Sequence, residues 1–208
     1  MHPILNDLVK RYPELAACAA AIQKAADLLT AAYLQGGKIL LCGNGGSAAD
    51  CEHIAGELMK GFVLPRPLTK EQKEDILKAG GSNHMASALQ GALPAISLCG
   101  HPSLATAFIN DVDAALVFAQ QVWGLGNKGD ALIAISTSGN AENVLNAAIA
   151  ARAKGLYVLG LTGESGGKLD ALCDVCLKAP AAKTYEVQEY HLPVYHALCL
   201  ILEQAFFS

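Results

Sequence analysis

The stretch from residue 39 to residue 57 constrains the fold of this chain more than any other. Four apolar residues, 39–42, predict a buried strand because no polar residue interrupts them. The following Gly43-Asn44-Gly45-Gly46 permits a tight turn in which backbone N–H groups can gather round an anion. From Ser47 onward the pattern is helical, so the partial positive charge of a helix N-terminus faces that turn. A strand, a glycine turn and a helix in this order predict a cradle for a phosphate or a sugar phosphate.

Two alternatives compete with a phosphate cradle at this turn. Gly43-x-Gly45-x-x-Ala48 also fits the dinucleotide-binding fingerprint, which expects an acidic residue at the end of the next strand. The next predicted strand, 94–98, runs into Cys99-Gly100 instead, so that acidic residue is missing. The other alternative is a turn that only connects a strand to a helix, and it stays open at this point.

Composition narrows the class of protein. The 208 residues are 52% hydrophobic and 16% charged, which is typical of a globular chain with one good core. A net charge of −4 gives no basic surface for nucleic acid. We find no signal-peptide pattern and no apolar run near the roughly 20 residues of a membrane span. The seven cysteines, an odd number, suit reduced thiols. We therefore expect a cytoplasmic protein that binds neither nucleic acid nor membrane.

Strand and helix patterns alternate along the chain. A long alanine-rich helix is predicted over 14–35, and buried strands are predicted at 39–42, 94–98, 131–135, 157–161 and 175–177. A loop is predicted at Asn110-Asp111, followed by a helix over 113–125. Wholly apolar strands that alternate with helices form a parallel sheet covered on both faces. The prediction is an α/β fold with a single domain over 1–208.

One segment departs from this alternation, at about 63–92. Two prolines, Pro65 and Pro67, exclude a regular element at its start. Thr69-x-x-Gln72 then forms a capping box before a helix predicted over 70–78. We predict an inserted helical excursion from the surface, which either covers the mouth of a site or merely decorates the surface.

A second polar turn follows the third predicted strand. Ser136-Thr137-Ser138-Gly139 precedes a helix, so its hydroxyls and backbone N–H groups can bind a phosphate, although a plain helix cap would look the same. Ligands of parallel sheets sit beyond the carboxyl ends of the strands, where this turn and the Gly43 turn both lie. We predict that the backbone of 136–139 and the hydroxyls of Ser47, Ser136, Thr137 and Ser138 hold a phosphate. Since the chain lacks the Gly-Lys-Ser/Thr of a nucleotide-triphosphate loop, we favour a small phosphorylated metabolite.

Ionisable side chains recur at helical spacing on two predicted helices. His53 and Glu57 are four residues apart and lie about 40° apart round a helix, hence on one face. Gln188 and His196 are eight residues apart, about 80° round the last helix, so they can also share a face. Either pair alone is more often a surface contact than a catalytic one.

Taken together, the motifs strongly resemble the sedoheptulose-7-phosphate isomerases (phosphoheptose isomerases) of the sugar isomerase (SIS) superfamily. The resemblance covers nearly the whole chain, in order. It implies a flavodoxin-like three-layer sandwich with a five-stranded parallel sheet and a long N-terminal helix. It also implies a homotetramer with active sites at subunit interfaces. The matching motifs are Cys42-Gly43-Asn44-Gly45-Gly46-Ser47, His53-x-x-x-Glu57-Leu58, Asn110-Asp111, Ser136-Thr137-Ser138-Gly139-Asn140, Leu161-Thr162-Gly163, and Gln188-Glu189 with His196.

The same resemblance implies an aldose–ketose isomerase. Such an enzyme converts sedoheptulose 7-phosphate to D-glycero-D-manno-heptose 7-phosphate through an enediol, with Glu57 as base and His196 as acid/base partner. Some members bind a zinc ion, which His53, Glu57, Gln188 and His196 would hold here through two imidazole nitrogens and two side-chain oxygens. The residues implied in substrate binding are Asn44, Gly45, Ser47, Asn110, Asp111, Ser136, Thr137, Ser138, Asn140 and Gln188.

The chain departs from the family pattern in three places. Ala141 stands where a further Ser is usual, Lys183-Thr184-Tyr185-Glu186 replaces a short acidic stretch, and the excursion at 63–92 replaces a short loop. The alternative function is that of a non-catalytic SIS tetramer, which binds a replication initiator protein or senses a sugar phosphate. Such relatives are expected to lack the acid/base pair, whereas this chain keeps both Glu57 and His196.

Overall fold

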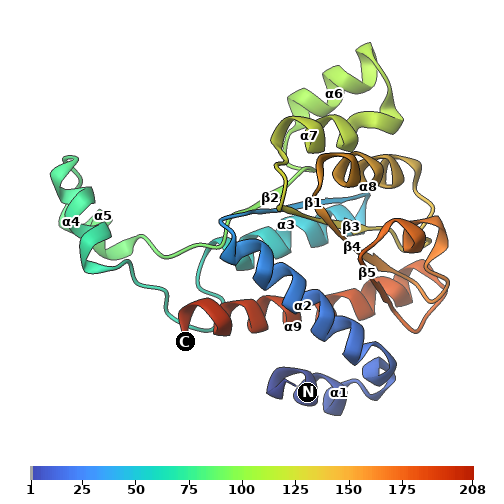
Figure 1. Ribbon diagram of the computed structural model, residues 1–208, viewed down its shortest axis with the longest axis horizontal. Coiled ribbons are helices and arrows are strands. Elements are labelled where there is room, and N and C mark those ends of the chain that lie inside the picture. Colours follow the sequence, from blue (N-terminus) through green and yellow to red (C-terminus); the bar gives the residue numbers. More distant parts are fainter. Residues whose placement is uncertain (1) are drawn as a thin grey trace.

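A computed structural model of the protein describes residues 2–208 and places five strands in one sheet (Figure 1). All neighbouring strands pair in parallel, in the order β2-β1-β3-β4-β5. This is the strand order of flavodoxin-like doubly wound folds, so the predicted fold class is confirmed. The strands are β1 (Ile39–Gly43), β2 (Ala95–Ser97), β3 (Ala131–Ile135), β4 (Tyr157–Thr162) and β5 (Val175–Lys178).

Helices cover both faces of the sheet (Figure 1). Successive strand residues point to opposite faces. Ile39 and Leu41 therefore belong to one core cluster, under the helices of the first face. Leu40 and Cys42 belong to a second core cluster, under the helices of the second face. The first face carries α1 (Pro3–Arg11), α2 (Ala19–Leu34), α3 (Gly46–Met59) and α9 (Thr184–Phe207); the second carries α6 (Pro102–Asp111), α7 (Val117–Leu125) and α8 (Glu142–Lys154).

The N-terminal helical segment differs from the single helix predicted over 14–35. It begins as the 3-10 helix η1 (Pro13–Cys18) and continues as α2. By length and composition, Pro13–Leu34 is apolar enough to cross a membrane, contrary to our expectation that no segment reaches that limit. Its residues Leu15, Ile22 and Leu29 are fully buried in the core cluster of the first face. This is how a core helix of a globular domain packs.

Two boundaries correct the sequence-based assignment on the second face. Asn110 and Asp111, predicted to form a loop, are the last two residues of α6. The helix predicted from residue 113 is interrupted, since the 3-10 helix η2 (Ala114–Leu116) precedes α7. Asp113 starts this new helix as its cap, because its Oδ1 accepts the N–H of Ala115 at 2.7 Å. The short helix η3 (Gly167–Leu172) precedes β5.

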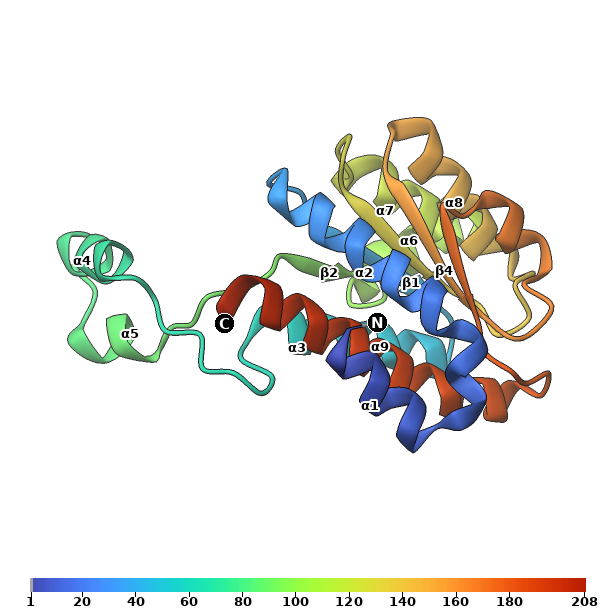
Figure 2. The ribbon, with the colours of Figure 1, turned by 60° about the horizontal axis from the view of Figure 1, so that its bottom comes forward.

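Residues 63–92, which we call the arm, extend away from the rest of the chain (Figures 1 and 2). The arm carries α4 (Lys70–Lys78) and α5 (Asn83–Ala88). Both hydrogen bonds of the predicted capping box between Thr69 and Gln72 are present. Pro67 and Gln90 form an antiparallel bridge, so the two ends of the arm run side by side.

A buried ion pair fixes the root of the arm to α9. Glu203 and Arg66 are 1% and 2% exposed, and their closest charged atoms are 2.8 Å apart. The Glu203 carboxylate also accepts the backbone N–H groups of residues 62–64, at 2.8 to 3.0 Å. Arg66 donates in turn to the carbonyl oxygens of Leu58 and Glu57 at the end of α3. The root is thus a closed polar network that touches α3 where Glu57 lies.

Candidate active site

Two loops lie together at the carboxyl edge of the sheet. Strand order reverses between β1 and β3, and the polar turn that follows each of these strands lies at that switch point, where open α/β sheets bind ligands. The side-chain amides of Asn44 and Asn143 join the loops through two reciprocal hydrogen bonds of 2.9 Å. Asn143 was not predicted. As the second residue of α8, it is recognisable as a site residue only once the two loops are known to be neighbours.

The turn after β1 depends on its glycines. Gly45 adopts φ 56° and ψ −120° as the residue before α3, a conformation that side chains rarely allow. A Cβ on Gly43 would lie 2.9 Å from the Cβ of Ser47, so only glycine permits the helix to start this close to the strand. Ser47 is 4% exposed, which leaves its hydroxyl less open than we predicted for a phosphate ligand.

The loop after β3 is equally tight. Gly139 has φ 65°, and a Cβ there would clash with the carbonyl oxygen of Gly166. Asn140 stabilises the loop, because its backbone N–H donates to Ser138 Oγ at 3.2 Å and its amide to the Ser138 carbonyl at 2.9 Å. Among residues 2–208, the backbone N–H groups of Thr137 and Ser138 have no hydrogen-bond partner. Unpaired N–H groups before a helix N-terminus suit an anion.

A hollow of about 340 Å³ opens beside the first turn. It is lined by Gly43, Asn44 and Gly45 on one side and by residues of α6 and α7 on the other. Ile109 lines it, but Asn110 and Asp111 do not; they are exposed, and their side chains bond to each other at 2.8 Å. The structure therefore brings the predicted glycine-turn residues to this hollow and leaves the Asn110-Asp111 pair at its margin.

Helices α3 and α9 pack in parallel and bring both members of the predicted catalytic pair, Glu57 and His196, against His53. His53 Nε2 lies 3.3 Å from Glu57 Oε1, and the ring of His196 stands edge-on to that of His53, with centroids 5.1 Å apart. His196 Nε2 is a buried nitrogen without a hydrogen-bond partner among residues 2–208. Burial lowers the pKa of His196, and the neighbouring His53 adds to that shift. Glu57 also accepts from Lys60 at 2.9 Å.

Two further residues that the sequence did not single out complete this cluster. The Tyr195 hydroxyl donates to Asp50 Oδ1 at 3.2 Å and lies 3.0 Å from His53 Nδ1. Burial raises the pKa of Tyr195 well above its ordinary range, so the hydroxyl keeps its proton. From the sequence alone, Tyr195 would be assigned to the core as an aromatic residue. Only the packing of α9 on α3 shows that its hydroxyl reaches polar atoms.

Gln188 lies apart from the other three predicted zinc ligands. Its amide stands beside Gly46, where a Cβ would lie 2.6 Å from the amide nitrogen. Gly46 precedes His53 by seven residues, which is about 10 Å of helix rise. Among residues 2–208, no group of three or more His, Cys, Asp or Glu side chains is gathered closely enough to hold a metal.

The donor set nevertheless suits a divalent cation. His196 Nε2 is orphaned and buried, and His53 Nε2 faces Glu57 Oε1 within 3.3 Å, so nitrogen and oxygen ligands that zinc accepts converge on one region. His53, Glu57 and His196 are the residues that would hold such an ion. Gln188, beside Gly46, lies apart from them.

Comparison with known proteins decides the family. A model of the SIS domain matches residues 6–74 and 79–163. A phosphoheptose isomerase from Burkholderia pseudomallei is 42% identical over 189 residues, which are 91% of this chain and 84% of that protein. This chain belongs to the phosphoheptose isomerase family. The enzyme of that name from Rhodospirillum rubrum is 40% identical over 191 residues, 92% of this chain and 89% of its own length.

Solved structures agree with this family membership. The phosphoheptose isomerase of Neisseria gonorrhoeae superposes with a TM-score of 0.73 at 33% identity, covering 96% of this chain and 91% of that one. The phosphoheptose isomerase of Francisella tularensis gives 0.77 at 32% identity, covering 93% and 91%. The predicted family and its class, a phosphosugar isomerase, are confirmed.

Proposed function

We propose that this protein converts sedoheptulose 7-phosphate to D-glycero-D-manno-heptose 7-phosphate. One observation carries the proposal: a carboxylate and an imidazole, Glu57 and His196, both contact His53 on packed helices of the same chain as the two polar loops. The similarity of this chain to phosphoheptose isomerases over most of its length supports this substrate.

The chemistry needs two proton movements. A ketose becomes an aldose when a base takes a proton from C1, forming an enediol, and returns it to C2, while a second group moves a proton between the two oxygens. Glu57 is the base at carbon in this proposal, and His196 exchanges the proton at oxygen. With its lowered pKa, His196 is available as a neutral imidazole that can accept as well as donate.

The phosphate end of the sugar belongs at the two loops. We assign its binding to the backbone of 136–139 and the hydroxyls of Ser47, Ser136, Thr137 and Ser138. The remaining predicted substrate contacts are Asn44, Gly45, Asn140 and Gln188, with Asn110 and Asp111 at the margin. Unpaired N–H groups at Thr137 and Ser138 support this assignment. A complex with a sugar phosphate or sulfate that places the anion elsewhere would contradict it.

A zinc ion is part of the proposal as a structural element of the site. When bound, it would fix the geometry of the cluster and polarise sugar oxygens as a Lewis acid. A carboxylate shared with a metal is a weaker base, so we favour the first of these two roles. His53 and His196 would be its nitrogen ligands, Glu57 and Gln188 its oxygen ligands.

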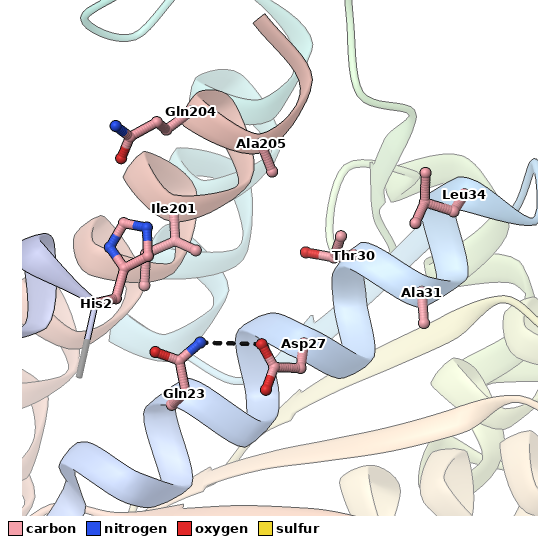
Figure 3. Close-up of a pocket in the computed structure, with 9 residues that line it drawn as sticks. All are labelled: His2, Gln23, Asp27, Thr30, Ala31, Leu34, Ile201, Gln204 and Ala205. Carbon is pink, nitrogen blue, oxygen red and sulfur yellow. Dashed lines mark hydrogen bonds between the residues drawn. The ribbon is translucent and has the colours of Figure 1, made fainter. Parts of the chain in front are cut away.

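We also propose a cytoplasmic homotetramer with active sites at subunit interfaces. A groove of about 400 Å³ runs between α2 and α9, where Leu34, Ala31 and Ala205 offer apolar surface (Figure 3). Leu34 is 73% exposed at the end of α2. The arm extends from the same end of α9 with little of its own surface covered (Figure 2). Light scattering on a size-exclusion column tests this assembly.

The second candidate function is a non-catalytic SIS tetramer that binds a replication initiator or senses a sugar phosphate. Retention of both Glu57 and His196 favours the enzyme. Incubation with sedoheptulose 7-phosphate, with detection of the aldose product, distinguishes the two. Turnover supports the isomerase; binding without turnover of any ketose or aldose phosphate would support the alternative.

A further inference from the structure

Two cysteines, Cys173 and Cys176, lie close together at one edge of the sheet. Cys176 is on β5, the last strand in the sheet order, and its register partner on β4 is Gly160. A Cβ on Gly160 would lie 2.7 Å from the sulfur of Cys173 and 3.2 Å from the sulfur of Cys176. Both sulfur atoms therefore border the same small space, which exists because residue 160 is a glycine.

A bend in the chain before β5 brings the two thiols to one side of the sheet. Residues three apart on a regular strand point to opposite faces. Here the strand begins only after Asp174, which forms a bend and accepts the N–H of Val158 through its carboxylate at 2.7 Å. Cys173 thus lies outside the strand, at the end of η3, with its sulfur 3.1 Å from the carbonyl oxygen of Leu169.

A pair of adjacent thiols can bind a metal or form a disulfide. A metal needs further ligands, and residues 2–208 gather no group of three or more His, Cys, Asp or Glu side chains that could supply them. Both thiols are free and only half-buried, whereas four of the other five cysteines are buried. We propose that Cys173 and Cys176 are a site of reversible oxidation, at which a low-molecular-weight disulfide converts the two thiols into one intrachain disulfide.

The contact between the two thiols makes Cys176 the attacking residue. The hydrogen bond from Cys173 lowers the pKa of Cys176 and outweighs the opposing effect of burial. The Cys176 thiolate attacks one sulfur of the small disulfide and expels the other half as a thiolate, which leaves a mixed disulfide on Cys176. Cys173 then loses its proton and attacks the Cys176 sulfur, which expels the second half. Two protein thiols are oxidised by two electrons, and one small disulfide is reduced to two thiols.

Peptide mapping of the whole protein tests this site. Trypsin cleaves after Lys168 and Lys178, so both cysteines fall in one peptide, 169–178. The protein is equilibrated with oxidised and reduced glutathione, quenched in acid, unfolded and alkylated. We expect this peptide to carry no alkyl label and to be lighter by two hydrogen atoms than the reduced peptide. Treatment with dithiothreitol before alkylation should restore both labels. Cys99→Ser is the matched control, since Cys99 is the other half-buried cysteine, and it should leave this result unchanged.

Two further variants test the order of attack and the shared space. Cys173→Ser should stop at a glutathione adduct on Cys176, because the second thiol is missing. Gly160→Ala places a methyl group against both sulfurs and should lower the fraction of disulfide at a given ratio of oxidised to reduced glutathione. Gly124→Ala should not, since its Cβ meets nothing within 4 Å. In wild type, two alkylated cysteines in the peptide at every glutathione ratio, separate glutathione adducts on both, or pairing of either one with another cysteine would overturn the inference.

Discussion

The two halves of the candidate site are built in different ways. The loops after β1 and β3 consist of backbone N–H groups, glycines and short hydroxyl side chains, and each is held in shape largely by its own residues. The cluster of His53, Glu57 and His196 consists of side chains from two helices that are far apart in the sequence. The proposed anion binding therefore depends on local geometry, and the proposed proton transfer depends on how α3 packs against α9.

Of the variants that test this difference between the two halves, a substitution at the root of the arm should have the largest effect. Glu203→Gln leaves the buried Arg66 without its countercharge, so we expect a loss of about 3–5 kcal/mol in the free energy of unfolding. Because Arg66 also binds the carbonyl of Glu57, activity should suffer more than phosphate binding. Denaturant unfolding measures the loss of stability, and turnover and phosphate titration measure the other two. Equal losses of turnover and of phosphate affinity would contradict the separation of the two halves.

The Glu203 carboxylate should also make the stability of the protein depend on pH. Burial opposes its ionisation, but three backbone N–H groups and Arg66 outweigh burial, and the pKa of Glu203 lies below its ordinary 4.5. A carboxylate with a lowered pKa in the folded state stabilises the protein above its unfolded pKa. That contribution is lost as the pH falls from about 4.5 through the folded pKa. Unfolding curves of wild type should show this loss in acid, and those of Glu203→Gln should be flatter over the same range.

A substitution in the loop after β3 can change that loop and leave the cluster of His53, Glu57 and His196 intact. Gly139→Ala forces a side chain onto a positive φ and onto the carbonyl of Gly166, so we expect a cost of about 1–3 kcal/mol and a raised KM. Gly36→Ala is the matched control, since Gly36 has φ 76° but open space around its Cβ position. If both variants raise KM equally, the loop is not the phosphate site.

Deletion of residues 68–91 should have the smallest effect on chemistry. The arm leaves the loops and the cluster of its own chain intact, so we expect kcat to persist. KM should rise or the assembly should weaken, because an ordered segment with so much exposed surface suits contact with a neighbouring copy. Kinetics and light scattering check this. No change in either would make the arm a surface decoration.

The same difference between local and long-range contacts explains which features could be predicted from the sequence. The strands, both loops and the capping box follow from local patterns such as Gly43-x-Gly45 and Thr69-x-x-Gln72, which act within a few residues. The grouping of Tyr195 with Asp50, separated by 145 positions, has no such local signal. Asn110 and Asp111 were expected in a loop because such residues favour turns, but α6, begun by Pro102, continues through them.

Gln188 and His191, both on α9, show the same limit of prediction from the sequence. Helical spacing allowed Gln188 to share a face with His196, but the parallel packing of α9 on α3 places Gln188 beside Gly46. His191, off that face by the same arithmetic, is buried, with Nε2 3.2 Å from the Thr162 carbonyl oxygen. Spacing predicts which residues share a face, and tertiary packing decides what each one meets.

The proposed role of Glu57 is tested most directly by turnover and binding of Glu57→Gln on sedoheptulose 7-phosphate. The amide keeps the shape of the side chain but cannot take a proton from carbon. We expect kcat to fall by about 10²–10⁴-fold or more, with the dissociation constant for the sugar phosphate nearly unchanged. Glu52→Gln, an exposed carboxylate on the same helix, should behave as wild type. A near-normal kcat in Glu57→Gln would show that another group takes the proton and would contradict the mechanism.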